Sequence, residues 1–201
     1  MKNLVKYTVI GSLAVFCYSC GGSSSDSTKD AKDSNNAKMD SGNSMTSTTP
    51  AIPPSVSKGD QDFAVNTANA GMTEIQAGQM AEQKGAAKDV KEYGAMMVKD
   101  HTAAADKLKM IAASKNLTLP STVSSDMQKD LDDLSKKEGK DFDKAYINMM
   151  ISDHKKVISA FEDESKNGSD ADIRGFADST LHVLRHHLDE AEKCHKMMKK
   201  M

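Results

Sequence analysis

The sequence has no tryptophan, and aromatic residues make up only 4% of its 201 residues. It contains four prolines, of which only Pro120 lies after residue 60. A core must therefore be built mainly from Ala, Leu, Ile, Val and the 14 methionines. Alanine, methionine, lysine and glutamate are good helix formers, whereas strands favour β-branched and aromatic residues. The composition predicts an all-α fold.

A strong charge of either sign is also missing, because the formal net charge is −2. Without a basic surface or an aromatic platform, the chain lacks the features that bind nucleic acid. It contains neither a Gly-x-Ser-x-Gly motif nor a Walker phosphate-binding loop. We therefore expect no nucleic-acid partner and favour a role that is not enzymatic, and the sequence identifies no protein partner.

Cysteine is scarce, and its positions indicate a lipid anchor rather than disulfide bonds. The first residues, MKNLVKYTVIGSLAVFCYSCGG, hold two lysines, an apolar stretch from about Thr8 to Phe16, and then small residues. This stretch is shorter than the roughly 20 residues that span a bilayer. It resembles a bacterial lipoprotein signal, in which a cysteine after small residues becomes the lipidated first residue. Cys20 follows Ser19 and fits that role better than Cys17; an ordinary secretory signal is the alternative.

We therefore predict a signal peptide over residues 1–19 and a lipid-modified Cys20 that binds the membrane. The protein would then be a lipoprotein of the bacterial cell envelope, facing the periplasm or the exterior. Residues 20–60 are rich in Ser, Asp, Thr, Asn and Lys and have almost no apolar content. Such a segment cannot bury enough surface to offset its ordering entropy, so we predict a disordered tether.

Residues 61–201 are predicted to form one helical domain. Four long helical patterns cover residues 61–84, 87–115, 141–166 and 170 to the C-terminus, and a short one covers 126–136. The long helices form two antiparallel hairpins, joined by a longer crossover that contains the short helix. Two hairpins with one long connection are typical of the ferritin-like four-helix bundle, which is the fold that we predict.

Each predicted long helix has one ionisable side chain on its apolar face. Core positions in a bundle recur at three- and four-residue steps. At such steps Glu74 follows small residues, whereas His101, His154 and His187 lie among larger apolar residues. Counting back to each hairpin turn spreads the four over about 12 Å of the bundle axis. The helices must therefore be staggered if these side chains are to meet.

The four side chains are candidate ligands of one transition-metal ion. A buried charge is costly unless it is paired or binds a metal. Three imidazoles and a carboxylate suit zinc, iron, manganese or copper. The repeated phrases MMVKDH and MMISDH place Asp100 and Asp153 directly before two of the histidines. Each aspartate could reach a neighbouring helix, either as a ligand or as an outer partner that accepts from an imidazole N–H. The predicted ligands are Glu74, His101, His154 and His187.

The leading hypothesis is thus a binding or stress-related module with a polar core layer that holds a metal ion. In a first alternative, the same layer contains no metal and only fixes helix register in a structural or interaction bundle. In a second, the protein is a metal-dependent, oxidase-like redox bundle. A dimetal site of that kind needs more core carboxylates than Glu74 alone.

Residues 61–192 resemble the 4142 family of domains of unknown function. The resemblance covers the stretch DFAVNTANAGMTEIQAGQMAEQKGAAKDVKEYGAMMVKDH and then LTLP, FDKAYINMMISDH and TLHVLRHHLDEA. It implies a ferritin-like four-helix bundle that is usually exported in bacteria, and it brings no established reaction. The matching marks are Gly71-Met72-x-Glu74, Met97-x-x-Asp100-His101, Asp153-His154 and His187-Leu188.

The last predicted helix departs from the family pattern. The family commonly has Leu-Pro where this chain has Leu181-His182. A proline would kink or cap a helix at this point. Its absence removes an expected kink or cap, so the family pattern does not fix the exact position of His187.

Overall fold

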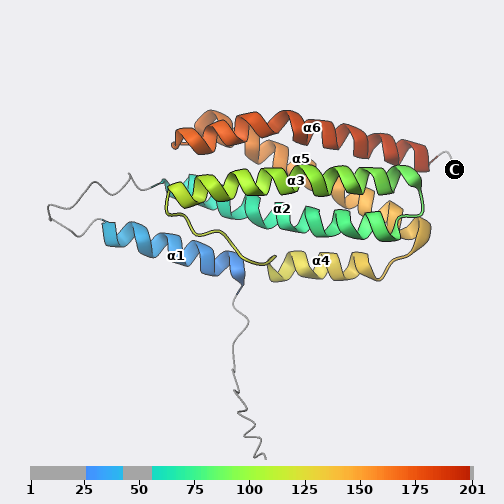
Figure 1. Ribbon diagram of the computed structural model, residues 1–201, viewed down its shortest axis with the longest axis horizontal. Helices are drawn as coiled ribbons and strands as arrows, with labels where there is room; N and C mark the ends of the chain where they lie inside the picture. The colour runs from blue at the N-terminus through green and yellow to red at the C-terminus, as the bar shows by residue number, and fades with distance from the viewer. Residues whose placement is uncertain (1–25, 43–55, 200–201) are drawn as a thin grey trace, which may run out of the picture.

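The computed structural model describes residues 26–42 and 56–199. In these ranges the chain forms six helices and no strand, which confirms the predicted all-α fold (Figure 1). Cys20 lies outside the described residues. None of the described helices is long and apolar enough to cross a membrane. The helices are α1 (Ser27–Gly42), α2 (Lys58–Lys84), α3 (Lys88–Ser114), α4 (Ser125–Ser135), α5 (Gly139–Asn167) and α6 (Ala171–Met198).

The four long helices form two hairpins, α2 with α3 and α5 with α6, as predicted. Each hairpin turns at a glycine, Gly85 after α2 and Gly168 after α5. The N–H of Gly85 donates to the carbonyl of Ala81, and that of Gly168 donates to the carbonyl of Glu164. A β-carbon at either glycine would lie 2.7 Å from that same carbonyl oxygen. Both turns therefore require a residue without a side chain.

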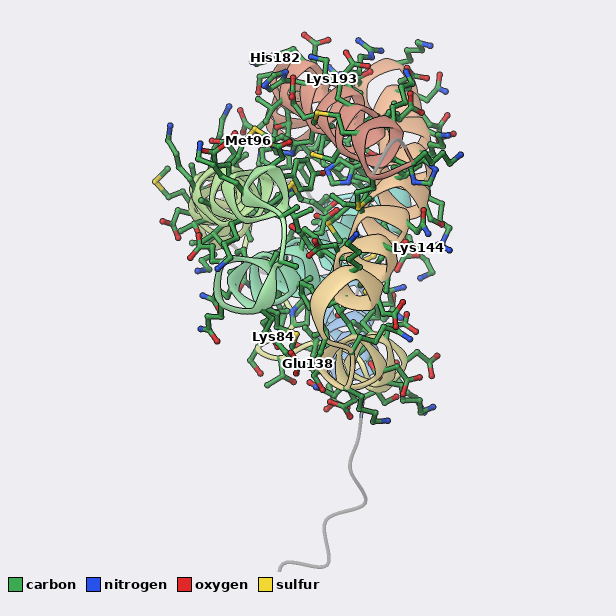
Figure 2. The ribbon with its side chains drawn as sticks, turned by 90° about the vertical axis from the view of Figure 1, so that its right-hand side faces the viewer. Lys84, Met96, Glu138, Lys144, His182 and Lys193 are labelled. Carbon is green, nitrogen blue, oxygen red and sulfur yellow. The ribbon has the colours of Figure 1, made fainter. Side chains whose placement is uncertain are left out.

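The two hairpins pack against each other, α2 on α5 and α3 on α6 (Figures 1 and 2). Buried aspartates join the opposite ends of this arrangement. Asp60, near the start of α2, accepts hydrogen bonds from the backbone N–H groups of Ser169 and Asp170. Asp143, near the start of α5, accepts them from Ala86 and Ala87. Each hairpin thus holds the turn of the other.

Helix α6 is continuous over residues 171–198 and includes His187. The crossover between α3 and α5 contains α4, which packs on α2 and α5 (Figure 1). Helix α4 begins at Ser124, whose side chain accepts a hydrogen bond from the N–H of Met127. This cap and the buried Leu131 and Leu134 fix the short helix on the long hairpins.

Helix α1 is the main departure from the predicted organisation. It lies within residues 20–60, for which the sequence predicts a disordered tether, and the chain is helical there over Ser27–Gly42. Polar contacts replace the missing apolar face. The amide of Asn35 donates to the carbonyl of Thr118 and accepts from the N–H of Thr118, at 2.9 and 2.7 Å. Ala31 is buried, and Asp26 accepts a hydrogen bond from the N–H of Ser125.

The core consists of two apolar clusters with a polar layer between them. One cluster, towards the α2–α3 turn, includes Met97, Phe142, Tyr146 and Met150. The other, towards the α5–α6 turn, includes Leu108, Phe161, Phe176 and Leu184. Along every long helix, the ionisable residue picked out by the sequence pattern lies where these two clusters meet.

Candidate metal centre

Four side chains, one from each long helix, form this polar layer. Glu74 comes from α2, His101 from α3, His154 from α5 and His187 from α6. Their exposed fractions are 3%, 8%, 0% and 0%. The stagger of the helices closes the axial spread that the sequence left open. The three imidazole rings have centroids 5.1 to 5.7 Å apart.

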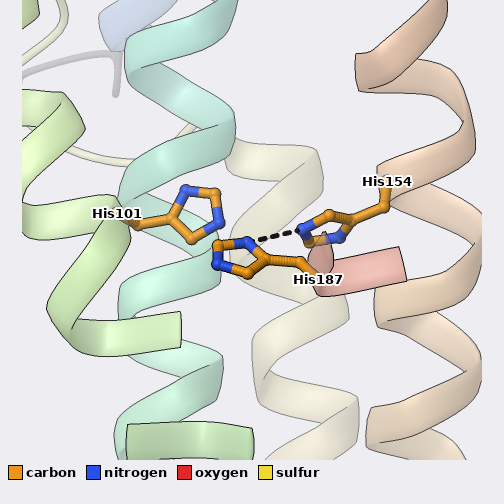
Figure 3. A group of neighbouring side chains, drawn as sticks. All are labelled: His101, His154 and His187. Carbon is orange, nitrogen blue, oxygen red and sulfur yellow. Dashed lines mark hydrogen bonds between the residues drawn. The ribbon is translucent and has the colours of Figure 1, made fainter. Parts of the chain in front are cut away.

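The three imidazoles face one another across the layer (Figure 3). One ring nitrogen of each lies within 4.8 Å of the others. The shortest separation is 3.3 Å, between His154 Nε2 and His187 Nδ1. His101 Nε2 is buried and has no hydrogen-bond partner among the described residues. Figure 3 shows the ring of His101 turned towards the other two.

The second nitrogen of each ring has a separate partner, and we call these three interactions the outer contacts. His101 Nδ1 lies 3.1 Å from Glu74 Oε2. His154 Nδ1 lies 2.9 Å from the carbonyl oxygen of Met150. His187 Nε2 lies 3.1 Å from Asp100 Oδ2. The outer contacts leave one nitrogen of each ring directed into the layer.

The burial of the layer favours its uncharged forms. It lowers the pKa of His101 well below its usual value, and the other two imidazoles add to this effect. Burial likewise lowers the pKa of His154 to about 4, and it lowers the pKa of His187 against the opposing effect of Asp100. Burial, followed by the charge of Asp153, raises the pKa of Glu74 to about 8. Near neutral pH the histidines are therefore neutral, which is the form that binds metals.

At neutral pH the 3.1 Å contact between Glu74 Oε2 and His101 Nδ1 is accordingly a contact between two neutral groups. Glu74 Oε1 lies 3.5 Å from His154 Nδ1 and has no hydrogen-bond partner among the described residues. A cation in the layer would favour the ionised form of Glu74 and would displace its proton.

The structure brings together all three predicted histidines. The three predicted acids each lie in a different position relative to these histidines. Glu74, expected as a fourth ligand, lies against the outer nitrogens and outside the group of three facing nitrogens. Asp100, expected as an outer partner, contacts an imidazole on a different hairpin from its own. Asp153, expected in the same role, lies 3.3 Å from Lys156 and forms no hydrogen bond or ion pair with a histidine of the described residues.

Sequence reasoning missed one outer contact, the carbonyl of Met150. It lies four residues before His154, so an imidazole on the same helix face can reach it. A backbone oxygen gives no signal in the sequence apart from this spacing. Because a carbonyl can only accept, His154 must carry its proton on Nδ1, and its Nε2 has a free lone pair.

Two comparisons with known proteins returned nothing: no curated protein and no solved structure matched the chain. The third found a family. Its model, described as Domain of unknown function (DUF4142), matches residues 45–194. The matched range includes all four long helices up to Cys194 and every residue of the polar layer.

Proposed function

Because the chain belongs to the DUF4142 family of domains of unknown function, we propose its function from the site: it binds one transition-metal ion through His101, His154 and His187. The nitrogens that would bind the ion are those directed into the layer. The outer contacts with Glu74, Met150 and Asp100 would hold the rings in place. Metal-binding histidines commonly have such a partner on their second nitrogen.

The main support for this proposal is that two neutral imidazoles have too few protons to make all of their contacts hydrogen bonds. The line of contacts runs from the Met150 carbonyl through His154 and His187 to Asp100, at 2.9, 3.3 and 3.1 Å. Three hydrogen bonds need three protons, but two neutral imidazoles supply only two. The contact between His154 Nε2 and His187 Nδ1 is the one that an ion can replace, since both nitrogens then act as ligands.

The spacing of these two nitrogens also suits a metal. A tetrahedral zinc ion binds nitrogen at about 2.0–2.1 Å, which places two such ligands about 3.3–3.4 Å apart. The distance between His154 Nε2 and His187 Nδ1 is 3.3 Å. Three imidazoles leave a fourth position for water or another small ligand, as in catalytic zinc sites. Copper, iron and manganese also accept imidazole and remain alternatives.

The layer without metal is the second candidate, and the contact between His187 and Asp100 favours it. If His187 were doubly protonated, it could donate to both His154 and Asp100, and the third proton would be supplied. The layer would then be a structural network that fixes helix register. An oxidase-like dimetal site finds less support, because among the described residues Glu74 is the only carboxylate that belongs to the layer.

We extend the proposal to topology and location. The aspartate contacts described above place the α2–α3 turn beside the open end of the other hairpin, so neighbouring long helices are antiparallel. This arrangement and the crossover through α4 support a ferritin-like bundle. The signal-like first residues support export and a lipid on Cys20, which would hold the domain at an envelope membrane.

Zinc titration of the metal-free protein tests the proposal. We expect one site per chain, and the alanine variants of His101, His154 and His187 should each lose it. The exposed pair His182 and His186 provides the matched control, because two histidines four residues apart can bind metal adventitiously. The double variant His182→Ala/His186→Ala should retain the site. If this double variant alone abolishes binding, the buried layer is not the metal site.

A further inference from the structure

A large cavity lies between the two hairpins, on the side of the layer towards the α5–α6 turn. Its volume is about 730 Å³, and all four long helices contribute to its wall together with Leu119, Pro120 and Met127. This volume is within the range of small-molecule sites, roughly 300–1,000 Å³. The main apolar side chains of the wall are Phe63, Leu108, Val157, Phe161, Phe176 and Leu184.

The cavity arises because the hairpins pack unequally on the two sides of the layer. On α2, Ala77 and Ala81 lie beyond Glu74 and are fully buried. Thr67 and Ala70 lie on the same face before Glu74, at positions that the pattern assigns to the core, yet they are only half-buried. Both line the cavity. These two core positions of α2 are thus less covered than Ala77 and Ala81, on the side of the layer where the cavity lies.

Gly71 gives independent evidence of open space. This residue lies in the middle of α2 and lines the cavity. A β-carbon built on it would meet no atom within 4 Å. Glycine in a helix interior is unfavourable relative to alanine. A glycine here, without a close neighbour that requires it, keeps the wall of the cavity free of side chains.

The two ends of the cavity differ in chemistry. At the layer, the wall includes Glu74 and His101, whose Oε1 and Nε2 atoms have no hydrogen-bond partner. At the α5–α6 turn it includes the acidic residues Asp60, Asp163 and Glu164. An anionic ligand would be repelled at this acidic end.

Lysines do not offset this acidity. Lys109 and Lys156 are the two lysines in the wall. They lie 3.4 and 3.3 Å from Asp106 and Asp153, an aspartate on the same helix in each case. The apolar middle, the acidic end and the unpartnered atoms at the layer together favour a neutral ligand.

We propose that this cavity binds a neutral small molecule with an extended apolar body and one hydrogen-bonding end group. The polar end lies at Glu74 and His101, and the apolar body runs towards the α5–α6 turn. This site goes beyond the proposed metal function. An ion on His101 Nε2 would leave Glu74 Oε1 as the atom that meets the end group, so the site stands whether or not the histidines hold an ion.

The neutral fluorophore N-phenyl-1-naphthylamine, titrated into the full chain, tests the proposal. We expect saturable binding of one molecule per chain. Gly71→Leu adds a side chain inside the cavity and should weaken binding at least about tenfold. Gly175→Leu is the matched control, because Gly175 is also a helix glycine whose β-carbon would meet nothing, but it is exposed and lies outside the cavity wall. This variant should bind like the parent chain.

Thermal unfolding shows whether both variants fold, which we expect because each replaces a helix glycine by a better helix former.

Competition then tests the charge preference of the site: lauryl alcohol should displace the fluorophore, and laurate should displace it much more weakly. Unsaturable binding, or equal binding by Gly71→Leu and the parent chain, would overturn the site. Displacement by laurate as effective as that by the alcohol would overturn the neutral ligand class. Each of these outcomes can occur with the zinc site intact, and loss of zinc binding leaves them unaffected.

Discussion

Asp100 on α3 lies 3.1 Å from Nε2 of His187 on α6, so the two hairpins are joined through the histidine layer. Asp100 directly precedes His101, yet it contacts a histidine of the other hairpin. Successive residues on a helix point about 100° apart. His101 therefore faces into the layer while Asp100 faces the neighbouring helix. The repeated Asp-His pairs differ in this respect, because Asp153 pairs with Lys156 instead.

The variant Asp100→Asn should weaken zinc binding by about 10- to 100-fold, the usual effect of losing an outer partner of a metal-binding histidine. An amide cannot match a carboxylate as an acceptor for the His187 N–H. Calorimetric titration of the metal-free protein measures the change. Asp106→Asn, at an exposed position of the same helix, is the control and should leave the affinity unchanged. Equal affinities for the two variants would show that Asp100 does not support the site.

The metal-free protein should lose stability as the pH rises from 7 to 8. The pKa of Glu74 is about 8 in the folded protein and close to 4.5 when the chain unfolds. The folded state therefore binds more protons in this window, and the free energy of unfolding should fall by about 1 kcal/mol between pH 7 and 8. Below pH 7 the raised pKa of Glu164, also caused mainly by burial, acts in the same direction.

Urea unfolding between pH 7 and 8, in the presence of a chelator, measures how the free energy of unfolding changes with pH. Glu74→Gln should remove most of this pH dependence, because the amide does not ionise. Glu92→Gln, the control, changes an exposed glutamate on α3 and should retain the pH dependence of the parent chain. A slope that survives Glu74→Gln would assign the effect to another group.

Asp143→Asn should destabilise the fold by about 1–3 kcal/mol, because a buried carboxylate that accepts two backbone N–H groups would be replaced by an amide with only one acceptor oxygen. Both N–H groups, of Ala86 and Ala87, lie 2.9 Å from the Asp143 oxygens. Asp141→Asn, two residues earlier and exposed, should change the unfolding free energy by less than about 0.5 kcal/mol. If the two variants unfold alike, Asp143 does not join the hairpins energetically.

Gly94→Ala should destabilise the protein by about 1–3 kcal/mol through overpacking. A β-carbon at Gly94 would lie 2.8 Å from the carbonyl oxygen of Gly78 and from the β-carbon of Ala81, where α2 and α3 approach closely. Gly175→Ala, at an open position, should instead stabilise the helix by about 0.5–1 kcal/mol. A lower melting temperature for Gly94→Ala and a higher one for Gly175→Ala would support close packing at Gly94. Stabilisation by both substitutions would contradict it.

The sequence predicted the long helices and the layer well, because both depend on local pattern. Apolar residues at three- and four-residue steps identified the core faces, and His101, His154 and His187 lay on those faces. Their meeting could not be derived, since helix stagger depends on packing between the hairpins. The place of Glu74 beside the outer nitrogens was missed for the same reason.

Helix α1 was missed because its stability comes from partners far along the chain. The pattern contains no apolar stripe, and the contacts of Asn35 with Thr118 join residues more than 80 positions apart. The cavity was missed for a related reason. Thr67 and Ala70 fit a core pattern, and only the spacing of the two hairpins leaves them uncovered.

The metal content of the native protein tests the central claim most directly. The full chain, purified without an affinity tag from its native source, would be analysed by elemental mass spectrometry beside His154→Ala and the exposed-site control His182→Ala. Metal binding at the layer predicts close to one equivalent of zinc, iron, manganese or copper in the parent chain and the control, and its loss in His154→Ala. A parent chain that holds none of these metals, and takes up none on reconstitution, would contradict it.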